Sequence, residues 1–122
     1  MLPRYCVRLF EDMEISAMQT QIQILTSQAK LVMEKYRETY SDVQMGRDYF
    51  PLKISEEWGE CLQAFLMYSD RGRQKGKTKE EIHELLSQEF ADVFAYLLLF
   101  AESEGVDLAK AIDQKWFLFL KG

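Results

Sequence analysis

Residues 89–100, EFADVFAYLLLF, decide the fold because they place two acidic side chains inside a long apolar run. Around them, apolar and acidic positions recur at alternating steps of four and three residues: Leu85, Glu89, Asp92, Tyr96 and Leu99. This spacing puts all of these positions on one face of an α-helix. Glu89 and Asp92 therefore project from a helix face on which apolar residues are expected.

A second segment, residues 53–67, repeats this arrangement. Its corresponding face consists of Lys53, Glu57, Glu60, Ala64 and Met67. If the two helices pack antiparallel along these faces, four carboxylates converge between them, with Glu56 at the edge. Two carboxylates about 4 Å apart repel by about 4 kcal/mol at an effective dielectric constant of about 20. Such a cluster takes up protons or a cation, and its oxygen donors suit Mg²⁺ or Mn²⁺.

Two other interpretations of the acidic residues compete with a magnesium site. Acidic pairs at helical spacing most often form solvated helix faces, because charged side chains usually lie at the surface. Glu80 and His83 also form a Glu-x-x-His motif, which di-iron helical bundles use on two of their helices. His83 is the only histidine and lies outside the carboxylate face, so we expect it to be a surface residue.

The rest of the chain divides into helices and short connections. Thr78 followed by Glu81 has the form of a capping box, and Gly105 suits the left-handed position that ends a helix. Asp107 then caps the last helix, and residues 1–12 fit either a short strand or a frayed lead-in. The sequence predicts one all-α domain over residues 1–122, a four-helix bundle with helices over residues 14–40, 51–69, 78–105 and 108–120.

Composition and charge exclude several classes of protein. Twenty acidic and fifteen basic residues give a net charge of −5, and 48% of the residues are apolar. This balance disfavours nucleic-acid polymers and anionic membranes as main partners, because both are bound by a basic face. The longest apolar run is too short to span a membrane, and the first residues do not resemble a secretory signal. Cys6 and Cys61 lack metal-ligand spacing, so we expect reduced thiols in a cytoplasmic protein.

The acidic residues also form a recognisable pair of motifs. Residues 56–60, EEWGE, are followed after 28 residues by residues 89–92, EFAD, which together have the form EExxE…ExxD. This pattern, with the later residues 105–108 (GVDL), resembles the MazG-like family of all-α nucleoside triphosphate pyrophosphatases, which is related to the dimeric dUTPases. The resemblance covers residues 53–115, about half of the chain.

The resemblance implies a role for each matching residue. Mg²⁺ would be bound by the four carboxylates Glu57, Glu60, Glu89 and Asp92. Glu56 would lie beside the metal site, and either Glu56 or Glu60 would accept the proton of the attacking water. Substrate contacts would come from Lys53, Trp58, Tyr96 and Lys115. The implied reaction is hydrolysis of a nucleoside triphosphate to the monophosphate and pyrophosphate.

The C-terminal segment departs from the family pattern. Phe119 stands where the family often has an asparagine, followed there by arginines that hold the triphosphate. The loop cations Arg71, Arg73, Lys75 and Lys77 could compensate for the missing phosphate grip or could simply favour solubility. This departure leaves open a second function, a helical oligomerisation or regulatory module without catalysis. The many apolar residues further predict a homodimer, or two dimers paired into a tetramer.

Overall fold

The computed structural model describes the backbone of residues 4–120 and the side chains of residues 14–120. It contains four α-helices and one short 3₁₀-helix: α1 (Arg4–Thr39), α2 (Tyr49–Tyr68), α3 (Lys79–Ser103), α4 (Leu108–Lys115) and η1 (Phe117–Leu120). All regular structure over residues 4–120 is helical, which confirms the all-α prediction. Within that range, no helix is both long enough and apolar enough to cross a membrane.

Helix α1 begins earlier than the sequence pattern indicated. Residues 4–12 belong to the helix, so both a strand and a frayed lead-in are wrong for them, while residues 1–3 lie outside the described residues. The alternation of Tyr5, Val7 and Leu9 was misleading because it is too short to outweigh helix propagation. From Arg4 to Met45 the sequence contains neither glycine nor proline, so nothing interrupts the helix before its end at Thr39.

The predicted capping motifs are confirmed, but not every predicted boundary: α2 begins at Tyr49 rather than at residue 51, and the last helix is shorter than predicted. The Thr78 hydroxyl accepts a hydrogen bond from the Glu81 backbone N–H, and the Glu81 carboxylate accepts one from Thr78, which completes the capping box. Gly105 has φ +68° directly after α3, and the Asp107 carboxylate caps α4. Helix α4 ends at Lys115 rather than near residue 120, and the following residues form η1.

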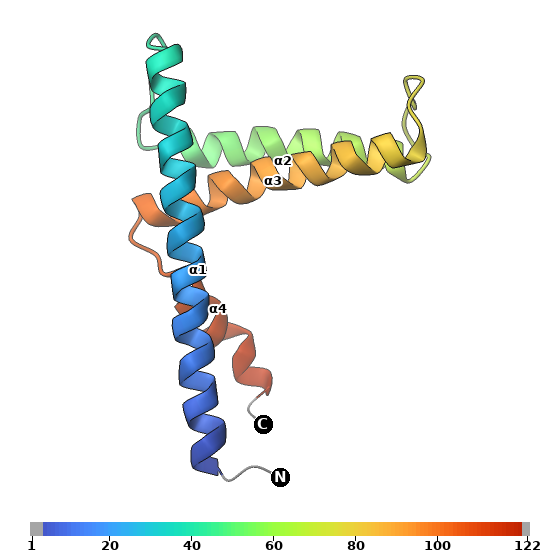
Figure 1. The fold of residues 1–122 in the computed structure, drawn as a ribbon. Helices are drawn as coiled ribbons and strands as arrows, with labels where there is room; N and C mark the ends of the chain where they lie inside the picture. Colours follow the sequence, from blue (N-terminus) through green and yellow to red (C-terminus); the bar gives the residue numbers. More distant parts are fainter. Residues whose placement is uncertain (1–3, 121–122) are drawn as a thin grey trace.

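Helices α2 and α3 form an antiparallel hairpin that projects sideways from the long helix α1 (Figure 1). Helix α4 lies beside the N-terminal half of α1, away from the hairpin (Figure 1). The buried apolar residues are few: Met33, Cys61, Ala64, Met67, Ile82, Leu98, Leu99, Ala101 and Ala109. The described residues of one chain therefore do not complete a four-helix bundle, which stays a prediction for the assembled protein.

Candidate metal centre

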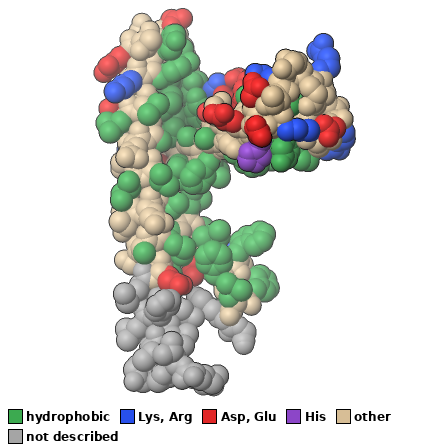
Figure 2. All heavy atoms as spheres, turned by 45° about the vertical axis from the view of Figure 1, so that its right-hand side comes forward, with side chains coloured by type: hydrophobic (Ala, Val, Ile, Leu, Met, Phe, Trp, Pro, Cys, Tyr) green, Lys and Arg blue, Asp and Glu red, His purple; other side chains and the backbone are tan. Residues whose placement is uncertain are grey.

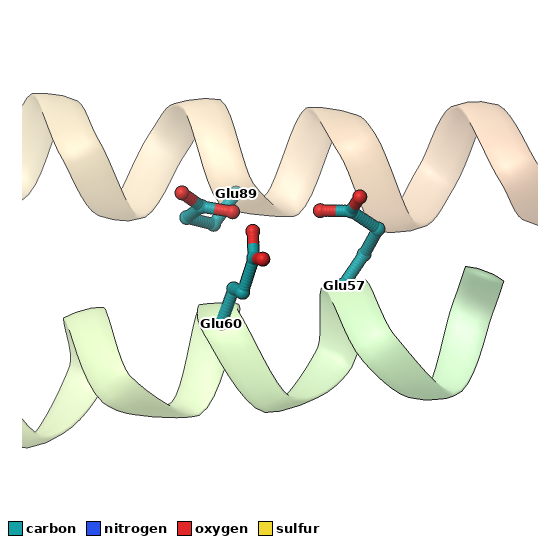
Figure 3. Close-up of side chains that lie close together, drawn as sticks. All are labelled: Glu57, Glu60 and Glu89. Atoms are coloured by element: carbon teal, nitrogen blue, oxygen red, sulfur yellow. The ribbon is translucent and has the colours of Figure 1, made fainter.

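The α2–α3 hairpin brings three carboxylates together at its centre. Glu57 and Glu60 project from α2 towards α3, and Glu89 projects from α3 into the same space (Figure 3). One oxygen of each residue lies within 4.8 Å of the other two. The antiparallel pairing of the two acidic helix faces places these side chains as the sequence spacing predicted.

Glu57 is buried and Glu89 is half-buried, whereas Glu60 is exposed. Glu57 is only 9% exposed, and burial followed by the charge of Glu60 raises its pKa. Burial, followed by the charges of Asp92 and Glu57, also raises the pKa of Glu89. The Glu89 Oε2 atom is buried and has no hydrogen-bond partner among the described residues. An unsatisfied buried oxygen is costly, and a bound cation is one of the few groups that could satisfy it.

Asp92, the fourth predicted ligand, lies close to this group but not within it. Its carboxylate does not belong to the set whose oxygens approach within 4.8 Å. Desolvation and then the charge of Glu57 raise its pKa, so the two carboxylates are within electrostatic reach of each other. The donors gathered here are all carboxylate oxygens, a chemistry that fits hard cations such as Mg²⁺ and Mn²⁺ rather than thiophilic metals.

Lys53 and Tyr96, two predicted substrate-binding residues, border the carboxylates. Lys53 Nζ lies 2.7 Å from Glu56 Oε1 and 3.5 Å from Glu57 Oε1. The hydrogen bond to Glu56 raises the pKa of Lys53, so this ammonium stays protonated beside the acidic group. Lys53 Nζ also lies 5.7 Å from the ring centre of Tyr96, whose pKa burial raises to about 12. This end of the site therefore carries the positive charge of Lys53 and the phenol of Tyr96.

The structure does not bring the other predicted substrate residues to the carboxylates. Trp58 follows Glu57 on α2, and consecutive residues of a helix project from different sides of it. Lys115 is the last residue of α4, which lies along α1 and away from the hairpin (Figure 1). Within one chain, Lys115 therefore cannot take part in a site at Glu57 without a rearrangement.

The histidine and the basic loop also lie outside the centre. His83 is exposed, as expected, and its ring packs 5.2 Å from that of Tyr68 (Figure 2). The group of possible metal ligands found among the described residues contains no histidine, so the structure gives no support to the di-iron interpretation. The loop with Arg71, Arg73, Lys75 and Lys77 forms the tip of the hairpin, at its end farthest from α1 (Figure 1).

Two features beside the centre were not anticipated from the sequence. Tyr49 and Phe50 pack around Tyr96, with ring centres 6.4 Å and 6.3 Å from it. The sequence could have indicated these neighbours, since Tyr49 and Phe50 precede Lys53 by about one helical turn and so lie on the same face of the helix. Cys61 is a buried free thiol next to Glu60, and burial followed by the charge of Glu89 raises its pKa.

Comparison with protein-family models, with curated proteins and with solved structures finds no significant match to this chain.

Proposed function

We propose that this chain is a magnesium-dependent nucleoside triphosphate pyrophosphohydrolase, which releases a nucleoside monophosphate and pyrophosphate. The observation that supports the proposal best is the meeting of Glu57, Glu60 and Glu89 around the unsatisfied Glu89 Oε2 atom. These residues belong to the EExxE…ExxD pattern that resembles the MazG-like family. The same proposal includes a homo-oligomer acting on a free nucleotide in the cytoplasm, where the buried Cys61 thiol would stay reduced.

In this proposal, Glu57, Glu60 and Glu89 hold the cation, and Asp92, which is within electrostatic reach of Glu57, would join them. When bound, Mg²⁺ neutralises phosphate charge and lowers the pKa of a coordinated water. Without such a cation, the acidic group would repel a triphosphate, since the nearest positive charge recorded beside it is Lys53. The requirement for a divalent cation follows from this balance of charge.

The residues around the cation site would then share the remaining tasks. Glu60 is one of the three carboxylates that meet between α2 and α3 (Figure 3). Glu56 lies beside them and forms an ion pair with Lys53, whose Nζ is 2.7 Å from Glu56 Oε1. We assign proton acceptance from the attacking water to Glu56, because Glu60 is engaged in cation binding. Lys53 and the hydroxyl of Tyr96 would contact phosphate oxygens, since the two residues lie together at one end of the site.

A screen of pyrophosphate release tests the proposal. Wild type is assayed with canonical and modified ribo- and deoxyribonucleoside triphosphates in Mg²⁺, with Glu57→Gln as the expected inactive variant. Glu84→Gln is the matched control, because Glu84 is an exposed glutamate of α3 outside the carboxylate group. We expect release by wild type and the control, and a loss of at least about a hundredfold in Glu57→Gln. Activity retained in Glu57→Gln would refute the site.

A second function is favoured by the position of Lys115 and the exposed apolar surface, namely a helical oligomerisation module without catalysis. Thermal unfolding separates the two functions. A catalytic metal site requires that Mg²⁺ raises the melting temperature of wild type and Glu84→Gln but not of Glu57→Gln. A melting temperature of wild type that Mg²⁺ leaves unchanged, together with no pyrophosphate release, would leave only the oligomerisation module.

A further inference from the structure

A cavity is lined by residues of α1, α2 and α3 at the end of the hairpin that lies against α1. Figure 1 shows α1 crossing the hairpin at this end. Its volume is about 320 Å³, within the range of small-molecule sites. Met33 and Leu99 are buried and Phe50 is half-buried, so the cavity has an apolar floor. Charged side chains of α1 and α3 form its rim. An apolar floor with a few polar groups at the edge is typical of a site for a flat, partly polar ring.

The cavity is joined to the carboxylate group by a continuous set of contacts. Lys53 Nζ lies 3.5 Å from Glu57 and 5.7 Å from the ring centre of Tyr96. The Tyr96 ring is 6.3 Å from that of Phe50, which lines the cavity. Along α3, Glu89 and Leu99 are separated by about 15 Å at 1.5 Å per residue. A nucleoside triphosphate with its phosphates at the carboxylates would have to span this distance to place its base in the cavity.

One carboxylate on the rim differs from the other charged groups in its contacts. Lys30 pairs with Glu102 at 3.6 Å, and Arg37 Nε donates to Met45 Sδ at 2.9 Å. The Glu34 side chain, in contrast, has no hydrogen bond or ion pair within the described part of the chain. It is exposed at the mouth of the cavity and acts only as a hydrogen-bond acceptor when ionised.

We propose that this cavity binds the base of the nucleotide and that Glu34 selects bases with an exocyclic amino group, a proposal that rests on the proposed function. Adenine, cytosine and guanine present an N–H₂ donor to a carboxylate. Uracil and thymine present one ring N–H flanked by two carbonyl oxygens, which a carboxylate repels. The substrate class is therefore the triphosphates of amino-bearing bases.

Binding of monophosphates tests this cavity without requiring hydrolysis. Calorimetry compares dAMP, dCMP and dGMP with dTMP and dUMP in Mg²⁺, for wild type, Glu34→Gln and Glu38→Gln. Glu38 is the matched control, since it is an exposed glutamate one turn further along α1 that does not line the cavity. We expect at least one amino-bearing monophosphate to bind wild type and Glu38→Gln about tenfold more tightly than dTMP or dUMP. Glu34→Gln should reduce this preference to about twofold or less, because its amide can also donate to carbonyl oxygens.

The outcomes separate this inference from the proposed function. Pyrophosphate release without base preference, or with a preference that Glu34→Gln leaves unchanged, overturns the inference and leaves the function standing. Selective monophosphate binding without pyrophosphate release from any triphosphate supports the cavity and overturns the catalytic proposal. If no monophosphate binds at all, the base site is overturned as well.

Discussion

Glu89 shows most clearly why the three carboxylates between α2 and α3 are unfavourable without a cation. Its Oε2 atom is buried without a hydrogen-bond partner among the described residues, and two other acids contribute to the rise of its pKa. An ion pair on the surface carries no comparable energetic cost, because water solvates both charges. Lys30 and Glu102 form such a pair, and both side chains are 54% exposed. The carboxylates between α2 and α3 therefore reduce stability in the absence of a cation, whereas acidic residues in surface ion pairs change stability little.

The pH dependence of stability follows from the direction of these pKa shifts. Because the pKa values of Glu57, Glu89 and Asp92 are raised by folding, the folded chain binds more protons than the unfolded chain above the ordinary carboxyl pKa of about 4. Their contribution to the free energy of unfolding therefore falls as pH rises through this window, and is constant above the raised values. Without a divalent cation, these three groups should make the protein less stable at neutral pH than near the ordinary carboxyl pKa of about 4.

A difference between variants isolates this contribution, because Glu81 and Glu104 have lowered pKa values and act in the opposite direction. Glu60→Gln removes the charge that helps raise the pKa of Glu57. In EDTA, we expect its free energy of unfolding in urea to exceed that of wild type by about 1 kcal/mol at pH 7, with the difference shrinking towards pH 4. Glu84→Gln should show no such trend. If the difference in unfolding free energy between Glu60→Gln and wild type does not vary with pH, the raised carboxyl pKa values are contradicted.

At the level of helices, local signals in the sequence predicted several capping positions but not the packing. The capping box at Thr78 and the left-handed Gly105 were predicted because their hydrogen bonds are local. The meeting of Glu57, Glu60 and Glu89 was predictable because helical spacing and one antiparallel pairing determine it. The cavity beside Phe50 was not, because it depends on where α1 crosses the hairpin, and no local pattern records that crossing.

Two glycines at different places in the helices give a paired test of this local control. Gly59 lies inside α2, and a Cβ added there would meet nothing within 4 Å. Gly59→Ala should therefore raise the free energy of unfolding by up to about 1 kcal/mol through helix propensity. Gly105 also has open space around it, but its φ of +68° strains any side chain. Gly105→Ala should lower the free energy of unfolding by about 1 kcal/mol.

Chemical unfolding of both variants measures these changes, with Mg²⁺ absent so that the nearby carboxylates do not add to them. The informative result is the opposite sign of the two changes, since both substitutions add the same methyl group. Equal destabilisation by both would mean that the middle of α2 is covered by another surface, and would contradict a Gly59 site open to solvent.

For the whole molecule, the balance of buried and exposed apolar surface points beyond one chain. Few large side chains are buried, while Trp58, Phe65, Phe90 and Phe94 on the hairpin are 44–54% exposed. Phe119 and Leu120 at the other end are more than 80% exposed. Figure 2 shows apolar side chains gathered along the α1 arm and on the C-terminal arm below the hairpin. Burying one large apolar side chain contributes about 1.5–3 kcal/mol, so an assembly that covers several of them would be strongly favoured.

We therefore expect a homodimer or larger homo-oligomer whose interface includes exposed apolar residues of the hairpin, Phe90 among them. Analytical ultracentrifugation at micromolar concentration should give at least twice the mass of one chain. Phe90→Glu should raise the dissociation constant at least about tenfold, because it places an unpaired charge at an apolar interface. Arg73→Glu, a charge change in the loop at the hairpin tip, should leave the mass unchanged. A monomeric wild type would refute this assembly, and Phe90 would then need another partner to cover it.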